Sequence, residues 1–341
     1  MFTYNKRRRR ILAHQADASG GPPRAMVLVD KPKPTESFIF LRGSPGRRGE
    51  KMDRRVPQIL GGDLVDKRTS GRLDLADMIV DSKNPLTARV FVNWVWTHHF
   101  GQSLIPTPGD LGLRGVPPSH PKLLDDLTRR FMDEGQWSTR WLHREIIFSQ
   151  AWRQSSTTRS KTIERDPDNT YYSRYRRRRL SWESWRDSLL VAAGTLTLDS
   201  RGGPGVDPLD PGNGTKRTLY SWIDRQDIPG ILRAFDIANP DTAVHVRPVT
   251  LVPQQGLVML NSPLVVDAAK KVASRLPDES DIPARIEQLW KIVFARSPRV
   301  DEIHMVQAWL ERAADSQSGN FGVWPQLAQA LISTAEFQYY D

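Results

Sequence analysis

The chain has 341 residues, of which 38% are hydrophobic and 26% charged, with 49 Lys and Arg against 39 Asp and Glu. A chain of this length exceeds the size at which a single hydrophobic core usually stops growing, so we expect two lobes. No apolar run approaches the roughly 18 to 20 residues that a membrane-spanning helix requires. The sequence contains no cysteine, which excludes disulfides, thiolate metal sites and covalent c-type haem, because that attachment needs Cys-x-x-Cys-His.

Positive charge is concentrated in the first part of the chain. Residues 1–200 carry 35 Lys and Arg against 22 Asp and Glu, an excess of 13 positive charges, whereas residues 201–341 carry 14 against 17. A basic surface can attract nucleic acid or another acidic partner. The simpler interpretation is that many guanidinium groups pair with carboxylates, because a charge excess alone indicates association behaviour and no specific partner.

The first 70 residues predict extended and irregular structure. Residues 1–24 hold a basic cluster, Arg7–Arg10, that precedes any periodic segment, and we expect this part to be disordered. No apolar stretch follows the cluster, so the segment lacks the form of a signal peptide, and the chain is either cytoplasmic or a fragment of a longer protein. The next residues are rich in Pro and Gly and contain two short β-like runs, Met26–Val29 and Ser37–Leu41.

From Gly71 the pattern becomes helical. The first helical stretch, "GRLDLADMIVD", is followed by "NPLTARVFVNWVWTHHFG" at residues 84–101. This second stretch begins with an N-cap asparagine and a first-turn proline and ends at a glycine, the usual C-terminal stop. Two further helices are predicted to begin at Ser119 and Ser138, and "SRYRRRRLSWESWRDSLLVAAG" predicts a fifth.

A Gly- and Pro-rich stretch, residues 201–217, is the best candidate for a linker between the lobes. Four helix candidates with apolar stripes follow it. The sequence therefore predicts a mainly α protein, a two-lobed helical bundle-like architecture with a few short β-strands near the N-terminus. Residues 25–200 would form a basic helical lobe with an extended N-terminal part, and residues 218–341 a C-terminal helical lobe.

Two adjacent histidines, His98 and His99, fall at the end of the second predicted helix. Two ligands of one metal ion on a helix need the spacing i, i+4, whereas adjacent side chains project about 100° apart. Only Arg89, Asn93 and Thr97 form a polar stripe on this helix, which predicts that the helix is buried on nearly every side. We therefore interpret both imidazoles as framework groups that donate to carbonyls at the helix end.

Arg89 presents a requirement of its own, because a buried guanidinium needs a carboxylate or several carbonyls. Asp77, Asp81 and Asp110 are the candidate partners, the last in the loop directly after the helix. We expect an ion pair or a carbonyl network at Arg89.

The loop "GDLGLRGVPPSHP" gathers Asp110, Arg114, Ser119 and His120 within a short stretch. An acid, a base and a hydroxyl beside the two histidines could form a catalytic or metal site. The simpler interpretation is that Asp110 caps a turn and Ser119 caps a helix. The catalytic candidates are His98, His99, Asp110 and His120, and the binding candidates are Arg89, Asn93 and Arg114. No cofactor and no metal ligand set is assigned.

The third cluster is Arg176–Arg179, which follows Tyr171, Tyr172 and Tyr175. Basic residues interleaved with aromatic ones could stack on bases and grip phosphates. Successive residues that enter a helix point in different directions, however, and the chain has no helix-turn-helix or zinc-finger pattern. We expect some of these arginines to pair with nearby carboxylates, namely Asp166, Asp168, Glu183 or Asp187. The sequence thus argues against nucleic-acid binding.

The chain resembles a bacterial family named domain of unknown function 1553, which occurs in large planctomycete proteins with cytochrome c-like modules. The similarity runs from about Ala25 to Asp341. It rests on blocks that stand in the family's order: "NPLTARVFVNWVWTHHFG", "GDLGLRGVPPSHPKLLDDL", "AWRQSS", "RRRRLSWESWRDSLL", "AFDIANPD", "VPQQGLVMLNSPLV" and "LISTAEFQYYD".

No activity is established for this family, so the resemblance implies a context, a longer envelope-associated or exported protein. The chain has no phosphate-binding Gly-x-x-x-x-Gly-Lys-Ser/Thr loop, no Gly-x-Ser-x-Gly elbow and no His-Glu-x-x-His. We therefore expect a non-catalytic binding or structural module whose basic lobe faces an acidic protein or an anionic polysaccharide. The alternative is a metal-dependent hydrolase acting through His98, His99, Asp110 and His120.

Overall fold

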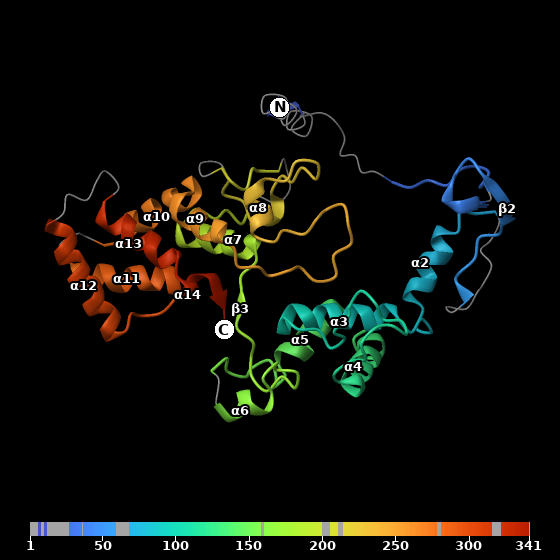
Figure 1. The fold of residues 1–341 in the computed structure, drawn as a ribbon, viewed down its shortest axis with the longest axis horizontal. Helices are drawn as coiled ribbons and strands as arrows, with labels where there is room; N and C mark the ends of the chain where they lie inside the picture. Colours follow the sequence, from blue (N-terminus) through green and yellow to red (C-terminus); the bar gives the residue numbers. More distant parts are fainter. Residues whose placement is uncertain are drawn as a thin grey trace. The chain divides into compact units, whose positions relative to one another are not determined.

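The computed structural model describes residues 6–7, 10–11, 27–35, 37–58, 68–157, 160–199, 205–210, 214–277, 281–315 and 322–340. The prediction of a mainly α protein is confirmed, since helices dominate this part of the chain and the strands are few and short (Figure 1). The segment expected to be disordered, residues 1–24, lies outside the described residues apart from four positions. None of the described helices is both long and apolar enough to cross a membrane.

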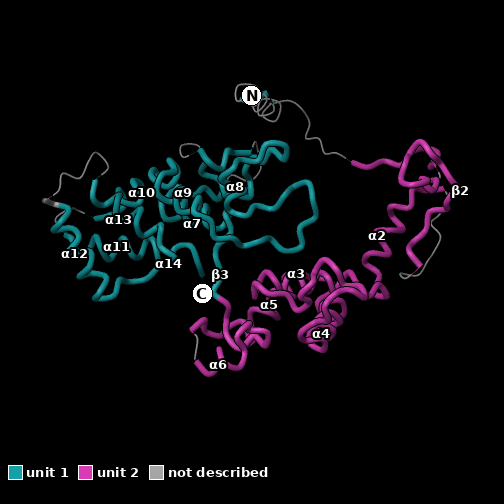
Figure 2. The backbone as a smooth tube through the Cα atoms, in the orientation of Figure 1, with its two compact units in different colours: residues 1–21, 177–341 teal, residues 22–176 magenta. Residues whose placement is uncertain are grey.

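The chain divides into two compact units (Figure 2). Unit 2 comprises residues 22–176, and unit 1 comprises residues 177–341 together with residues 1–21. The division falls directly after Arg176, which is N-terminal to the linker expected at residues 201–217.

The position of helix α7 (Trp182–Ala192) explains this difference. Trp182, Trp185 and Leu189 of α7 belong to the hydrophobic core of unit 1, not to the core of the preceding unit. The described residues of the Gly- and Pro-rich stretch also lie against α7. That composition therefore marks a segment that packs within unit 1, and the chain crosses between the units before α7 begins.

Unit 2 consists of a β-hairpin followed by helices. Its elements are β1 (Ser37–Phe40), β2 (Arg48–Met52), α2 (Arg72–Val80), α3 (Thr87–Phe100), α4 (Pro121–Asp133), α5 (Thr139–Ile147) and α6 (Ser160–Arg165). The predicted run Ser37–Leu41 forms β1, whereas residues 27–29 form no strand. The strands β1 and β2 pair antiparallel in a two-stranded sheet.

The core of unit 2 lies where α3 packs against α4 and α5. Val92, Phe100, Leu124, Phe131 and Leu142 are all buried there. Each comes from the apolar stripe of its helix, as helical periodicity requires.

Two helix ends in unit 2 follow their predicted local signals. Gly101 ends α3 in the left-handed conformation, with φ of 69°, which a residue without a Cβ adopts at little cost. The Ser138 side chain caps α5 by accepting the Trp141 N–H at 3.3 Å. Helix α3 starts at Thr87, later than predicted, because the Asn84 side chain accepts the Leu86 N–H in a turn ahead of it.

Unit 1 is built around α10, which packs against α7, α9, α11 and α13. Its elements after α7 are α8 (Gly230–Ala234), α9 (Pro253–Asn261), α10 (Pro263–Ser274), α11 (Ile282–Phe294), α12 (Val300–Asp315), α13 (Val323–Ile332), α14 (Ala335–Gln338) and β4 (Tyr339–Tyr340), with β3 (Arg178–Arg179) ahead of α7. Val265, Ala269 and Val272 of α10 are completely buried, as are Ile286 and Leu289 of α11.

The arginine run enters unit 1 as strand β3, which pairs antiparallel with β4 at the other end of the unit's sequence. The guanidinium of Arg178 lies 4.7 Å from the centre of the Tyr340 ring, and that of Arg179 lies 5.2 Å from the Phe235 ring. These cations thus stack on aromatic rings, an arrangement that stabilises a pair by about 0.5–2 kcal/mol. The contact between Arg178 and Tyr340 joins two of the sequence blocks that carry the family resemblance, "RRRRLSWESWRDSLL" and "LISTAEFQYYD".

Arg186 of α7 is fully buried, and its charge is accommodated by oxygen atoms of the following segment. Its Nε donates to the Pro208 carbonyl at 2.7 Å, and its Nη1 donates to the Lys216 carbonyl at 3.1 Å and to the Thr218 hydroxyl at 3.0 Å. Nη2 donates to the Gly214 carbonyl. Burial lowers the pKa of Arg186, because desolvation disfavours its charged form.

Arg296, just beyond α11, joins three helices through two carboxylates. Its guanidinium lies 2.7 Å from Glu302 of α12 and 2.6 Å from Glu336 of α14. Hydrogen bonds from Arg296 lower the pKa of Glu302 to about 2. Both side chains are mostly shielded from water, 29% exposed for Arg296 and 13% for Glu302, so this network contributes to the stability of unit 1.

Replacing Arg186 by lysine will destabilise the protein by about 3 kcal/mol, because an ammonium group cannot supply the planar fork of donors and leaves buried carbonyls unpaired. The measurement is the free energy of unfolding in urea. Arg225→Lys is the matched control, since Arg225 is 69% exposed and its replacement should change stability by less than about 0.5 kcal/mol. Equal unfolding midpoints for Arg186→Lys and the wild type would contradict the assignment.

Glu302→Gln will lower the free energy of unfolding at neutral pH and make it change less as the pH falls into the acid range. The carboxylate has a pKa of about 2 in the folded chain, below its ordinary value of 4.5. Its contribution is therefore complete above the ordinary value and is lost as the pH falls from about 4.5 to about 2. The test is urea unfolding across that pH range, with Glu311→Gln on the exposed side of α12 as control. A wild-type slope in Glu302→Gln would exclude this role.

Candidate functional site

Helix α3 and the loop after it carry the residues for which the sequence suggests chemistry. The expectation that α3 is buried on nearly every side is wrong. Val92, Val95 and Trp96 are buried, but the side chain of Trp94 is 41% exposed and His98 is also exposed. The main helix partners of α3 are α4 and α5, and their packing leaves Trp94 and His98 exposed.

Asn93, predicted to lie on a polar stripe, is almost completely buried. Its Oδ1 accepts the Ile105 N–H at 3.0 Å, and the Thr97 hydroxyl donates to its carbonyl at 2.6 Å. The side chain therefore satisfies a buried backbone donor in the loop that turns back along α3. This contact accounts for Asn93 as a folding residue, and its amide oxygen is already engaged.

His99 lies against a histidine that the sequence analysis did not single out. Its Nε2 is 2.7 Å from Nδ1 of His143 in α5, and the two rings meet edge to face. The Tyr175 hydroxyl donates to the His99 carbonyl at 3.1 Å. The pair comes from residues 44 positions apart, so no local spacing could have revealed it.

Asp110, Ser119 and His120 make contacts within their own loop. Asp110 Oδ1 accepts the Gly112 N–H at 2.9 Å, which confirms the predicted turn. The Ser119 hydroxyl donates to the Leu104 carbonyl at 3.3 Å. The expectation that Ser119 caps the helix is wrong, because its side chain does not cap α4. The Nδ1 of His120 lies 3.0 Å from the Ser119 hydroxyl oxygen.

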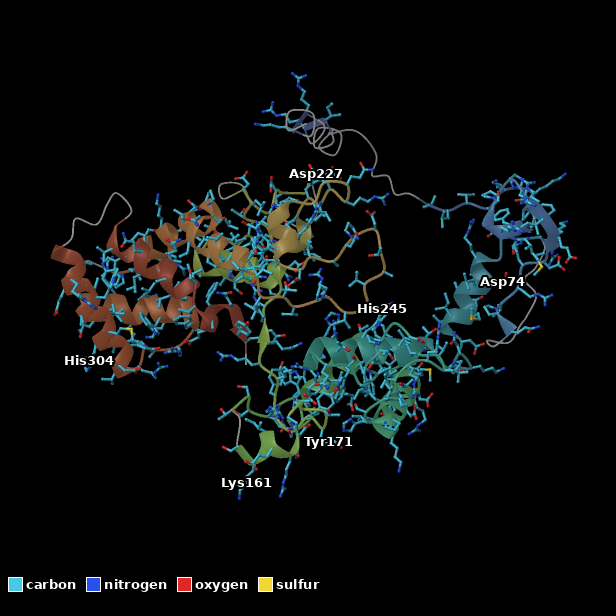
Figure 3. The ribbon with its side chains drawn as sticks, viewed as in Figure 1. Asp74, Lys161, Tyr171, Asp227, His245 and His304 are labelled. Carbon is cyan, nitrogen blue, oxygen red and sulfur yellow. The ribbon has the colours of Figure 1, made fainter. Side chains whose placement is uncertain are left out.

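The ring of His120 also packs against two tyrosines. Its centroid lies 5.6 Å from that of Tyr172 and 6.3 Å from that of Tyr171, which Figure 3 labels. Burial raises the pKa of Tyr172 to about 12, and its hydroxyl donates to the Gln102 carbonyl at 3.2 Å. Tyr172 is thus a neutral packing residue at physiological pH.

The four catalytic candidates do not gather into one metal site. Throughout the described ranges, no group of three or more histidine, aspartate or glutamate side chains is placed to hold a metal ion. His99 faces His143, whereas His120 and Asp110 contact their own loop.

The structure does bring Arg89 and Asp110 together, at a shallow cleft of about 300 Å³. The cleft is lined by Leu86, Arg89, Ile105 and the loop residues Asp110–Gly112, Leu113 and Gly115–Pro118. Arg89 forms an ion pair with Asp125 of α4. The ion pair at Arg89 is confirmed, but its partner is none of the three aspartates expected, because α4 packs along α3 and brings Asp125 within reach.

Arg114, the remaining binding candidate, is exposed in this loop beside Leu113, whose side chain is fully exposed. The cleft therefore has a partly shielded cation at one wall and a basic, apolar loop at its mouth.

Asn93→Ala will destabilise the protein by about 1–3 kcal/mol, because the buried Ile105 N–H loses its acceptor. Urea unfolding measures the loss, and faster hydrogen exchange of the Ile105 amide locates it. Thr87→Ala at the start of the same helix should change stability by less than about 0.5 kcal/mol. An unchanged Ile105 exchange rate in Asn93→Ala would show that the hydrogen bond has no such role.

Comparison with known proteins gives a family and no activity. No curated protein and no solved structure matches the chain. The model of the family PSD1, described as a protein of unknown function (DUF1553), matches residues 71–310. This range spans α2 to α12 apart from the last residues of α12, and includes the α3 cleft and the part of the unit 1 core that precedes α13. The chain therefore belongs to the DUF1553 family.

Proposed function

We propose that this chain is a non-catalytic binding module that acts through contacts of unit 2 with an acidic macromolecule. The carrying observation is the charge of that unit: residues 22–176 hold 26 Lys and Arg against 18 Asp and Glu. A net positive unit attracts polyanions over a range set by ionic strength, about 10 Å at 0.1 M salt.

Several cations of unit 2 support the proposal because they are exposed and form no ion pair with a described carboxylate. Arg114, Lys122, Arg140 and Arg153 are of this kind. Arg89 adds a fifth cation, whose ion pair with Asp125 is partly open to water, with 58% of the Asp125 side chain exposed. Exposed ion pairs of this sort stabilise by less than about 1 kcal/mol, so an incoming anion can compete for Arg89.

The polar groups of the cleft favour binding over catalysis. Asp110, which lines the cleft, already accepts the Gly112 N–H. No observation favours the metal-dependent hydrolase, and we do not propose it. The acidic partner is an acidic protein or an anionic polysaccharide, and the resemblance to envelope-associated proteins suggests an extracytoplasmic setting for it.

Charge reversal on unit 2 will weaken retention on a heparin column and on immobilised poly-glutamate. We expect Arg114→Glu/Arg140→Glu to elute at a lower salt concentration than the wild type, because two contact charges change sign. Arg225→Glu/Arg233→Glu in unit 1 is the matched control with the same change in net charge, and it should elute close to the wild type. Retention that ignores salt, or an equal shift in both variants, would refute binding through unit 2.

A further inference from the structure

Among the described residues, the β1–β2 hairpin, residues 37–52, is a sheet of two strands. Its register pairs Ser37 with Met52, Phe38 with Lys51 and Phe40 with Arg48, so that two residues of β2 oppose the single residue Ile39 of β1 in a bulge. No third described strand joins this sheet. Each outer edge therefore presents backbone N–H and C=O groups that a further strand could bind.

The hairpin exposes apolar side chains in place of burying them. Ile39, Phe40, Leu41 and Met52 are 43–49% exposed, and no residue of the hairpin belongs to the core of either unit. Isolated two-stranded hairpins are marginal in water, and a third strand or a packed face usually stabilises them. The exposed face thus lacks the cover that such a sheet ordinarily has.

The base of the hairpin is nonetheless fixed to the rest of unit 2. Asp30, ahead of β1, accepts the Ser70 N–H at 2.9 Å and forms an ion pair with Arg72. Arg54, just after β2, donates to the Thr69 carbonyl. The segment that opens α2 therefore holds the residues on both sides of the hairpin.

The hairpin is also basic. Arg42, Arg47, Arg48 and Lys51 stand against the single carboxylate of Glu50, and all four cations are exposed. No ion pair joins Arg42, Arg47 or Lys51 to any carboxylate in the described ranges. The Arg48 guanidinium lies 5.3 Å from the centre of the Phe38 ring, so the strands present cations and an aromatic ring side by side.

We infer that the hairpin is a docking site for an acidic, extended segment of another protein, which adds to β2 as a third strand. Strand β2 is the better edge for an acidic segment, because it carries Arg48 and Lys51 whereas β1 carries no charged residue. Backbone hydrogen bonds to β2 would give affinity, and carboxylates on the incoming strand would face Arg47, Arg48 and Lys51. This inference rests on the proposed acidic partner and makes that partner a polypeptide.

An open strand edge favours binding of a polypeptide over binding of other polyanions. Polysaccharides and nucleic acids carry the charge that arginines attract, but they lack the regular row of amide donors and acceptors that completes a β-sheet. The hairpin also precedes residues 71–310, the range matched by the family, so this docking surface lies outside the matched domain.

The test uses the whole chain and a labelled eight-residue peptide of alternating Glu and Val, with binding followed by fluorescence polarisation. We expect saturable binding that weakens with salt, and protection of the backbone amides of residues 48–52 in hydrogen exchange. A peptide with alternate Glu residues N-methylated keeps the charge but loses donors, and it should bind at least tenfold more weakly. Equal binding of the methylated peptide, or no binding of either peptide, overturns the inference.

Protein variants supply an independent arm. Arg47→Glu/Arg48→Glu should weaken peptide binding at least tenfold, whereas Arg225→Glu/Arg233→Glu in unit 1 should change it less than threefold. Equal weakening by both pairs overturns the assignment to the hairpin. Heparin retention distinguishes the two proposals. If heparin retains the chain but the peptide tests fail, only this inference is contradicted. If the chain binds neither heparin nor the peptide, the proposed function is contradicted as well.

Discussion

A guanidinium group buried without water must be given acceptors, and in unit 1 this requirement determines where the chain runs after α7. Arg186 is completely buried and gathers oxygen atoms from Pro208, Gly214, Lys216 and Thr218. A segment rich in Gly and Pro can follow this path because its carbonyls are not committed to helix or sheet. The Gly- and Pro-rich stretch that predicts a linker thus supplies carbonyl acceptors to a guanidinium group in the core.

The same rule applies in unit 2 to Asn93, which is buried and accepts the Ile105 N–H. Asp110 and Ser119 also form hydrogen bonds within the loop that follows α3, Asp110 with the Gly112 N–H and the Ser119 hydroxyl with the Leu104 carbonyl. What unit 2 leaves open to a partner is charge and apolar surface at its periphery.

Local signals in the sequence predicted local structure but did not predict the long-range contacts. The stop at Gly101 and the cap at Ser138 depend on the conformational preferences of single residues, so the sequence alone located both. The partner of Arg89 and the contact between His99 and His143 depend on how α3 meets α4 and α5, which no periodicity encodes.

The arginines show how far a net charge can be interpreted. One guanidinium, that of Arg186, is buried on carbonyls and cannot meet a partner. Others lie on aromatic rings, as Arg178 does on Tyr340 to join the two ends of unit 1. Only exposed cations such as Arg47 and Arg114 remain available to an acidic molecule. The excess of positive charge in the first 200 residues therefore overstates the binding surface, and the exposed cations are few enough to be tested one by one.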